Sequence, residues 1–240
     1  MRVPHLLPLL LATLLALAPA AARAGEPAPA SYPFPGGYTW GADYDTYKSL
    51  EGMRAAQDEA LAAGQEEGKF LELYRPGAEW AGHTWTEHLA FTRGKLDNVT
   101  LIAPYQRQTF NDVRARLEAE GYVILGILVD DKALDLFQLM QLQGPEAFNQ
   151  RFLELLREKV PQRISYDYFM IKGISEEQMR LTSSINQFLL GMDAGHMQVE
   201  VTMLGGEEAG SAPQTLCVNF TYPALARAQA VERPTKKLAP

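Results

Sequence analysis

Hydrophobic and polar residues follow two different periods along this chain, and each period predicts one type of element. Apolar residues that recur at intervals of three and four predict helices over residues 43–64, 109–120, 132–143 and 145–160. Ser175 and Gln178 have the spacing of a capping box, which predicts a further helix running to about residue 190.

Shorter segments have the period of two that is typical of strands. Strands are predicted at residues 69–74, 88–92, 99–103 and 164–171, the third of which could also be a short helical piece. Residues 123–129, "VILGILV", are apolar throughout, which suits a central strand covered on both faces. Residues 196–204 and 215–222 alternate most regularly and are joined by a polar loop, so they predict an antiparallel hairpin.

Together these elements predict an α+β fold: a mostly antiparallel sheet packed against helices, with a C-terminal β-hairpin. A parallel doubly wound fold is the alternative, and the apolar run at 123–129 is its main support. The length is sufficient for one domain with a real core, which we assign to residues 42–223.

Two segments flank this predicted domain. Residues 25–41 form an arm rich in Pro, Gly and aromatic residues, in which Tyr32, Phe34, Tyr38 and Trp40 are candidates to dock on the domain. Residues 224–240 are polar and are predicted to be a disordered tail.

The first 24 residues have the pattern of a signal peptide. Arg2 precedes a short apolar run, and Ala22 and Ala24 supply the small residues that signal peptidase requires. The run is interrupted by Pro8 and is too short for a membrane span, which needs about 20 apolar residues. We therefore expect cleavage after Ala24, a periplasmic or secreted bacterial protein, and no membrane-spanning segment in the mature chain.

Charge and cysteine content exclude some classes of function. Loss of Arg2 and Arg23 with the leader would lower Lys plus Arg from 22 to 20 against 29 acidic residues, so the net charge would change from −7 to −9. An acidic chain has no electrostatic attraction for nucleic acid or for an anionic membrane. Cys217 is the single cysteine, so no intramolecular disulfide can form, and we expect a buried thiol.

Residues 71–91, "LELYRPGAEWAGHTWTEHLAF", contain a motif of Gly77, Glu79, Trp85, Thr86 and Glu87. In this motif the segment resembles bacterial exported proteins of unknown function, which have a Gly-x-Glu turn and then Trp-Thr-Glu between two strands. The resemblance implies export and a two-strand unit with a structured connection. It implies no activity.

The residue types of the same segment suggest a candidate binding site. Trp85 and Glu87 share one face of an extended segment, so Trp85 is expected to pack on the core while Glu87 pairs with Arg75 or Arg107. We take Trp85, Glu87, Glu79 and Arg75 as candidate binding residues.

The histidines of "HTWTEH" suggest a metal site as an alternative. His83 and His88 are five residues apart, so they would diverge by about 140° on a helix and would point to opposite faces of a strand. Only a loop could bring them together, with His196 or Asp193 as a third ligand from elsewhere. The corresponding function is a metal-assisted hydrolase that uses His83, Glu87 and His88.

Other catalytic templates do not match the sequence. It contains no Gly-x-Ser-x-Gly motif and no phosphate-binding loop, so we assign no catalytic residue and expect no cofactor. The favoured function is a non-catalytic binding domain. Its partner would be an envelope or secreted protein, a lipid, another envelope component or a small apolar ligand.

Overall fold

The computed structural model describes residues 31–55, 70–129, 132–135, 166–172, 174–205 and 212–231, with a few single positions between 139 and 154. The chain divides into the units Met1–Ser31 and Tyr32–Pro240, and all elements below belong to the second. The predicted leader lies outside the described residues. Of the helix predicted at 145–160, only Glu146, Gln150, Arg151 and Glu154 are described, and each is helical. Among the described helices, none has the length and apolar character needed to cross a membrane.

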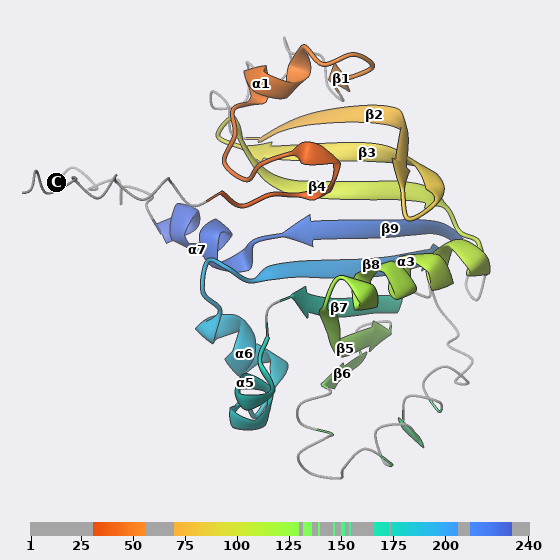
Figure 1. Cartoon of the computed structure of the whole chain (residues 1–240), viewed down its shortest axis with the longest axis vertical. Coiled ribbons are helices and arrows are strands. Elements are labelled where there is room, and N and C mark those ends of the chain that lie inside the picture. The colour runs from red at the N-terminus through yellow and green to blue at the C-terminus, as the bar shows by residue number, and fades with distance from the viewer. Residues whose placement is uncertain are drawn as a thin grey trace, which may run out of the picture. The chain divides into compact units, whose positions relative to one another are not determined.

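Nine strands of the described residues form one sheet in the order β1-β2-β3-β4-β9-β8-β7-β5-β6 (Figure 1). Every neighbouring pair is antiparallel, which confirms the α+β fold with an antiparallel sheet and corrects the parallel alternative. The C-terminal hairpin is confirmed as β8 and β9. The strands are β1 Arg54–Ala55, β2 Phe70–Trp80, β3 His83–Thr92, β4 Lys95–Pro104, β5 Tyr122–Val129, β6 Lys132–Asp135, β7 Tyr166–Lys172, β8 Met197–Gly205 and β9 Pro213–Thr221.

Two-residue turns connect the first long strands. Ala81 and Gly82 join β2 to β3 with φ of 50° and 77°, and Arg93 and Gly94 join β3 to β4 with φ of 55° and 73°. Positive φ at both central residues is the conformation that matches the right-handed twist of paired strands.

Pro76-Gly77, a dipeptide typical of turns, forms a β-bulge within one continuous strand. β2 runs through it to Trp80, and its pairing with β3 shifts between Pro76 and Ala78. The extra residue is Gly77, whose φ of 84° is readily available only to glycine. Because side chains alternate along a strand, this one insertion turns Trp80 to the same face as Trp85.

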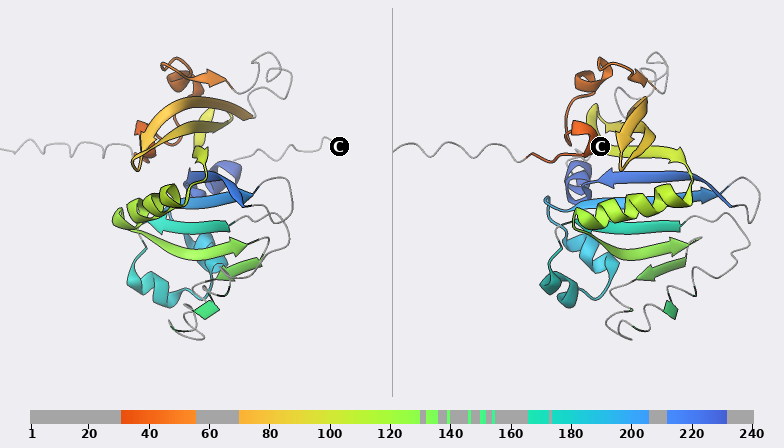
Figure 2. Two further views of the ribbon diagram at one scale, coloured as in Figure 1. Left: turned by 90° about the vertical axis from the view of Figure 1, so that its right-hand side faces the viewer. Right: turned by 45° about the vertical axis from the view of Figure 1, so that its right-hand side comes forward.

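The sheet has a core face and an outer face. The core face is covered by the arm from Tyr32 onward, by α1 (Tyr44–Lys48) and by α3 (Arg107–Ala119), which lies against the sheet in Figures 1 and 2. Docking of the predicted aromatic arm is confirmed, since Phe34 and Tyr38 belong to the buried core cluster and Tyr32 and Trp40 pack against this cluster. The core face carries the fully buried side chains Leu73, Leu89, Val99, Val201 and Val218.

A second, smaller cluster packs α6 (Ile185–Gly191) against β5 and β7. It contains Leu125, Ile171, Phe188 and Met192. Since Leu125 belongs to this cluster and Ile127 to the main core, β5 buries side chains on both faces. The interpretation of residues 123–129 as a strand covered on both sides is confirmed.

The α5 helix (Glu176–Leu181) begins with the predicted capping box. The Ser175 hydroxyl accepts from the Gln178 amide at 3.1 Å, and the Ser175 amide donates to Gln178 Oε1 at 2.8 Å. The helix was predicted to continue to about residue 190, but it ends at Thr182. The Ser184 hydroxyl then caps α6 by accepting from the Gln187 amide.

Two other helix predictions, and the prediction of a disordered tail, were wrong in extent. The helix predicted at 43–64 ends at Lys48, and Arg54–Ala55 pairs with β2 after Gly52, whose φ is 79°. The start of the helix predicted at 132–143 is β6, because pairing with β5 outweighs local spacing. The tail predicted to be disordered from residue 224 includes α7 (Pro223–Val231), which starts with Pro at its first position and packs Leu225 against the core.

Candidate functional site

Arg75, Glu87 and Tyr38 form a compact polar cluster on the core face. Register pairs Arg75 with Glu87 across β2 and β3, and Arg75 Nη2 lies 2.7 Å from Glu87 Oε2. Arg75 Nε also donates to this oxygen at 2.9 Å, and the Tyr38 hydroxyl donates to it at 2.7 Å. The predicted pairing of Glu87 with an arginine is confirmed with Arg75 as its partner, and Tyr38 extends the pair to the arm.

Burial sets the protonation of this cluster. Burial and the hydrogen bond to the Glu87 carboxylate hold the pKa of Tyr38 well above its ordinary value, so its hydroxyl stays a donor. Burial opposes the charge of Arg75, but the hydrogen bond and charge of Glu87 outweigh it and raise the pKa of Arg75. The cluster therefore combines the Arg75–Glu87 ion pair with a neutral phenol, and it attaches the arm to the sheet.

Trp85 is a core residue, as predicted. It is 1% exposed, its ring lies edge-on to Trp80 with centroids 6.0 Å apart, and its Nε1 donates to the Trp80 carbonyl at 2.8 Å. Trp80 in turn contacts the Phe220 ring of β9 at 5.7 Å. The indole rings of Trp85 and Trp80 therefore connect the β2–β3 hairpin to the centre of the sheet.

The four candidate binding residues do not make one exposed surface. Trp85 and Glu87 are 1% and 3% exposed, so no ligand reaches them in this structure. Glu79 is exposed and accepts from Thr84 Oγ1 at 2.6 Å across the hairpin. Only Arg75 joins Glu87, and its role there is structural.

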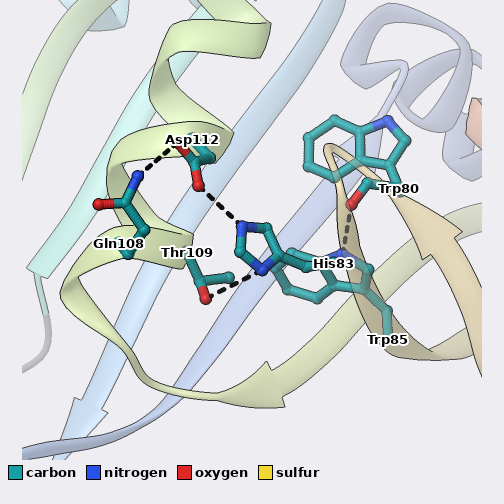
Figure 3. A network of polar contacts seen from close by, with 6 residues as sticks. All are labelled: Trp80, His83, Trp85, Gln108, Thr109 and Asp112. Atoms are coloured by element: carbon teal, nitrogen blue, oxygen red, sulfur yellow. Dashed lines mark hydrogen bonds and ion pairs between the residues drawn. The ribbon is translucent and has the colours of Figure 1, made fainter.

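His83 lies in a chain of hydroxyl, imidazole and carboxylate groups (Figure 3). Its Nε2 is 2.9 Å from Asp112 Oδ2, and its Nδ1 is 3.4 Å from Thr109 Oγ1, both residues being on α3. Such a chain can activate a hydroxyl as a nucleophile. However, Thr109 is only 4% exposed, so its hydroxyl cannot meet a substrate, and the chain fastens α3 to β3.

The three histidines do not converge on one point. His83 is on the core face, whereas His88, five residues later, is on the outer face with its Nε2 3.4 Å from Glu72 Oε1. His196 precedes β8 and is buried, with its Nδ1 2.7 Å from Asp193 Oδ1. In the described part of the chain, no group of three His, Cys, Asp or Glu residues could hold a metal ion. The geometry thus gives no support to the predicted metal site.

The sequence reasoning missed a line of side chains on the outer face, which we term the polar row. It crosses β2, β3, β4, β9 and β8, because register pairs each residue with the next. Thr100 Oγ1 donates to Asn219 Oδ1 at 3.2 Å within it, and all five side chains are partly exposed. The polar row consists of Tyr74, His88, Thr100, Asn219 and Glu200.

A second line of side chains lies beside the polar row on the same face. On each strand its residue is two positions away from the residue of the polar row. Asn98 donates to Asn219, and Gln198 Nε2 donates to Glu200 Oε1 at 2.8 Å, so the two lines are bonded to each other. This flanking row consists of Glu72, Ala90, Asn98, Thr221 and Gln198. Cys217 is also on this face and is half-buried, which corrects the expectation of full burial.

Comparison with known proteins gives no relative from which a role could be transferred: no family model, no curated protein and no solved structure matches the chain. The polar row must therefore be interpreted from its own chemistry.

Proposed function

We propose that this chain is an exported, non-catalytic binding domain that contacts a component of the bacterial envelope through the outer face of its sheet. The observation that carries this proposal is the polar row, a continuous set of partly exposed hydrogen-bonding side chains across five strands. Sites built on strands are held more rigidly than sites on loops, which favours recognition of a repeating or extended ligand.

The two faces of the sheet differ in how accessible their polar side chains are to a ligand. The core face is occupied by the arm, α1 and α3, and Glu87 on this face is buried and bound by Arg75 and Tyr38. The side chains of the polar row retain part of their surface. A ligand that binds without rearranging the fold would therefore use the outer face.

Export is part of the proposal and rests on the leader pattern. Arg2, the short apolar run and the small residues at Ala22 and Ala24 support cleavage after Ala24. A chain delivered to the periplasm or the exterior meets envelope components at high local concentration, which makes a modest affinity sufficient.

The proposed binding function is tested by cosedimentation with washed bacterial envelopes. The full chain is purified in the form that the cell exports. We expect saturable binding that Asn219→Ala and Tyr74→Ala each weaken about tenfold, since each removes contacts equivalent to about 1.4 kcal/mol. Asn111→Ala is the matched control, because Asn111 is an exposed amide on α3. Absence of binding by the unmodified chain, or equal binding by all variants, would overturn the proposal.

A further inference from the structure

We infer that the ligand of the outer face is a neutral glycan chain that lies along the polar row. The inference rests on the proposed function and names the class of its ligand. This row has two rings at one end, followed by a hydroxyl, an amide and a carboxylate. Sugars offer the matching groups: neighbouring hydroxyls that both donate and accept, and flat C–H faces that stack on rings.

The hydrogen-bonding groups suit hydroxyl recognition in particular. Asn219 and Asn98 carry amide groups, and Glu200 and Glu72 carry carboxylates. The bonds from Asn98 to Asn219 and from Gln198 to Glu200 hold these groups in place across the two rows. Planar groups of this kind can engage two adjacent hydroxyls at once. At one end of the row, Tyr74 and His88 are cross-strand neighbours and supply rings for stacking.

Charge argues against anionic ligands on this face. The polar row and the flanking row together contain two glutamates and no lysine or arginine. The whole chain is acidic, with a net charge of −7. Nucleic acids, phospholipid headgroups and acidic peptides require cations that these rows do not provide.

The residue types of the two rows argue against a lipid tail as the ligand. They also differ from the residue types of ordinary solvated surface. The large exposed hydrophobic residues in the described part of the chain are Leu50, Phe70, Leu181, Leu190 and Leu204, and none belongs to either row. Phe70 on β2 and Leu204 on β8 share the outer face, but three strands separate them, so they form no continuous apolar patch. The solvated surface of α3 is different again, because it carries ion pairs such as Arg114–Glu118 and Arg116–Glu120. Amides, hydroxyls and rings without lysine are typical of a recognition surface.

Geometry also favours a chain over a small molecule. Neighbouring strands are about 4.8 Å apart, so the five side chains span about 19 Å, enough for several sugar rings in line. The row lies in the interior of the sheet, where β2, β3, β4, β9 and β8 are already paired. A peptide that binds by adding a strand needs an unpaired edge, so this mode does not apply here.

The test is calorimetric titration of the full chain with maltotetraose, cellotetraose and the β-1,4-linked N-acetylglucosamine tetramer, and with a heparin oligosaccharide as anionic comparison. We expect at least one neutral tetrasaccharide to bind saturably and the heparin oligosaccharide not to bind. Asn219→Ala and Tyr74→Ala should each weaken that binding about tenfold, and Asn111→Ala should leave it unchanged. Thermal melts of each variant ensure that a loss of binding is not a loss of fold.

The outcomes separate the inference from the function on which it rests. If envelopes bind the chain but none of the neutral tetrasaccharides does, the glycan inference fails and the proposed function stands. If neither binds, both fail. Glycan binding that is equal in the Asn219, Tyr74 and Asn111 variants would remove the site from the polar row.

Discussion

Arg75 and Glu87 face each other across β2 and β3, with Nη2 2.7 Å from Oε2, and the Tyr38 hydroxyl closes the cluster from the arm. The carboxylate is nearly fully buried, whereas the Arg75 side chain is 31% exposed. A charge that is buried on one side only is stabilised chiefly by its partner, and removing the partner is costly. This pair therefore stabilises the attachment of the arm to the sheet.

We expect Glu87→Gln to lower the free energy of unfolding by about 2 kcal/mol. Glutamine keeps the shape but removes the charge, and solvent around Arg75 moderates the loss that a fully buried pair would show. Urea denaturation measures the change. Glu79→Gln is the matched control, because Glu79 is exposed on the same hairpin, and it should change stability by less than about 0.5 kcal/mol. Equal effects of the two variants would show that the buried pair adds nothing.

This pair also shows how much of a site a sequence can predict. Trp85 and Glu87 lie at i and i+2 in an extended segment, and that spacing was enough to predict a shared face and a buried indole. It also predicted an arginine partner for Glu87 but left Arg75 and Arg107 as alternatives, and the cross-strand register selects Arg75. The third member, Tyr38, was not predicted, because 49 residues separate it from Glu87 and no local pattern connects them.

The polar row could not be predicted for the same reason. Alternation marked the polar positions of each strand, but Thr100 meets Asn219 only because β4 pairs with β9, more than 100 residues later. Strand order and register depend on how the whole sheet assembles, not on local period. The fold class needs only the local periods, which is why it was predicted while the row was missed.

We expect the mature chain to begin at Gly25. Ala24→Arg should block processing, because signal peptidase requires a small residue immediately before the cut. Mass spectrometry of the protein from periplasmic and membrane fractions measures the N-terminus. Ala30→Arg is the control, since it introduces the same side chain beyond the expected cleavage point and should be processed normally. If the unmodified chain retained Met1 in the periplasmic fraction, the prediction of a cleaved signal peptide would be contradicted.

We expect the bulge at Gly77 in β2 to be required for the stability of the fold. Deleting Gly77 should lower the free energy of unfolding by about 3 kcal/mol or more, because Trp80 would turn to the outer face and lose its contacts with Trp85 and Phe220. Denaturation measures the loss, and near-UV circular dichroism reports the tryptophan surroundings.

Gly77→Ala is the matched control for the deletion. It keeps the extra residue, and no atom lies within 4 Å of the added methyl, so only the strain of φ 84° remains. That strain should cost about 1–2 kcal/mol. A deletion no more harmful than this substitution would mean that Trp80 does not depend on the bulge.

We expect the ionisation of Tyr222 to lower the free energy of unfolding at alkaline pH. Its hydroxyl donates to the Pro33 carbonyl at 2.8 Å, and burial, with the neighbouring Tyr32, raises the pKa of Tyr222 to about 12 from 10.0. Between these values the unfolded chain loses the proton and the folded chain keeps it. The stabilisation is therefore complete below pH 10 and is lost as the pH rises to 12, by about 1.4 kcal/mol for each pH unit.

Tyr222→Phe removes this titration along with the hydrogen bond. At pH 7 the variant should be about 1 kcal/mol less stable than the unmodified chain, because Pro33 loses its donor. At pH 12 the titration penalty of the unmodified chain, about 2–3 kcal/mol, should exceed that loss, so the difference should reverse in sign. Urea denaturation at both pH values measures it. A difference that stays constant with pH would mean that Tyr222 ionises equally in the folded and unfolded chain.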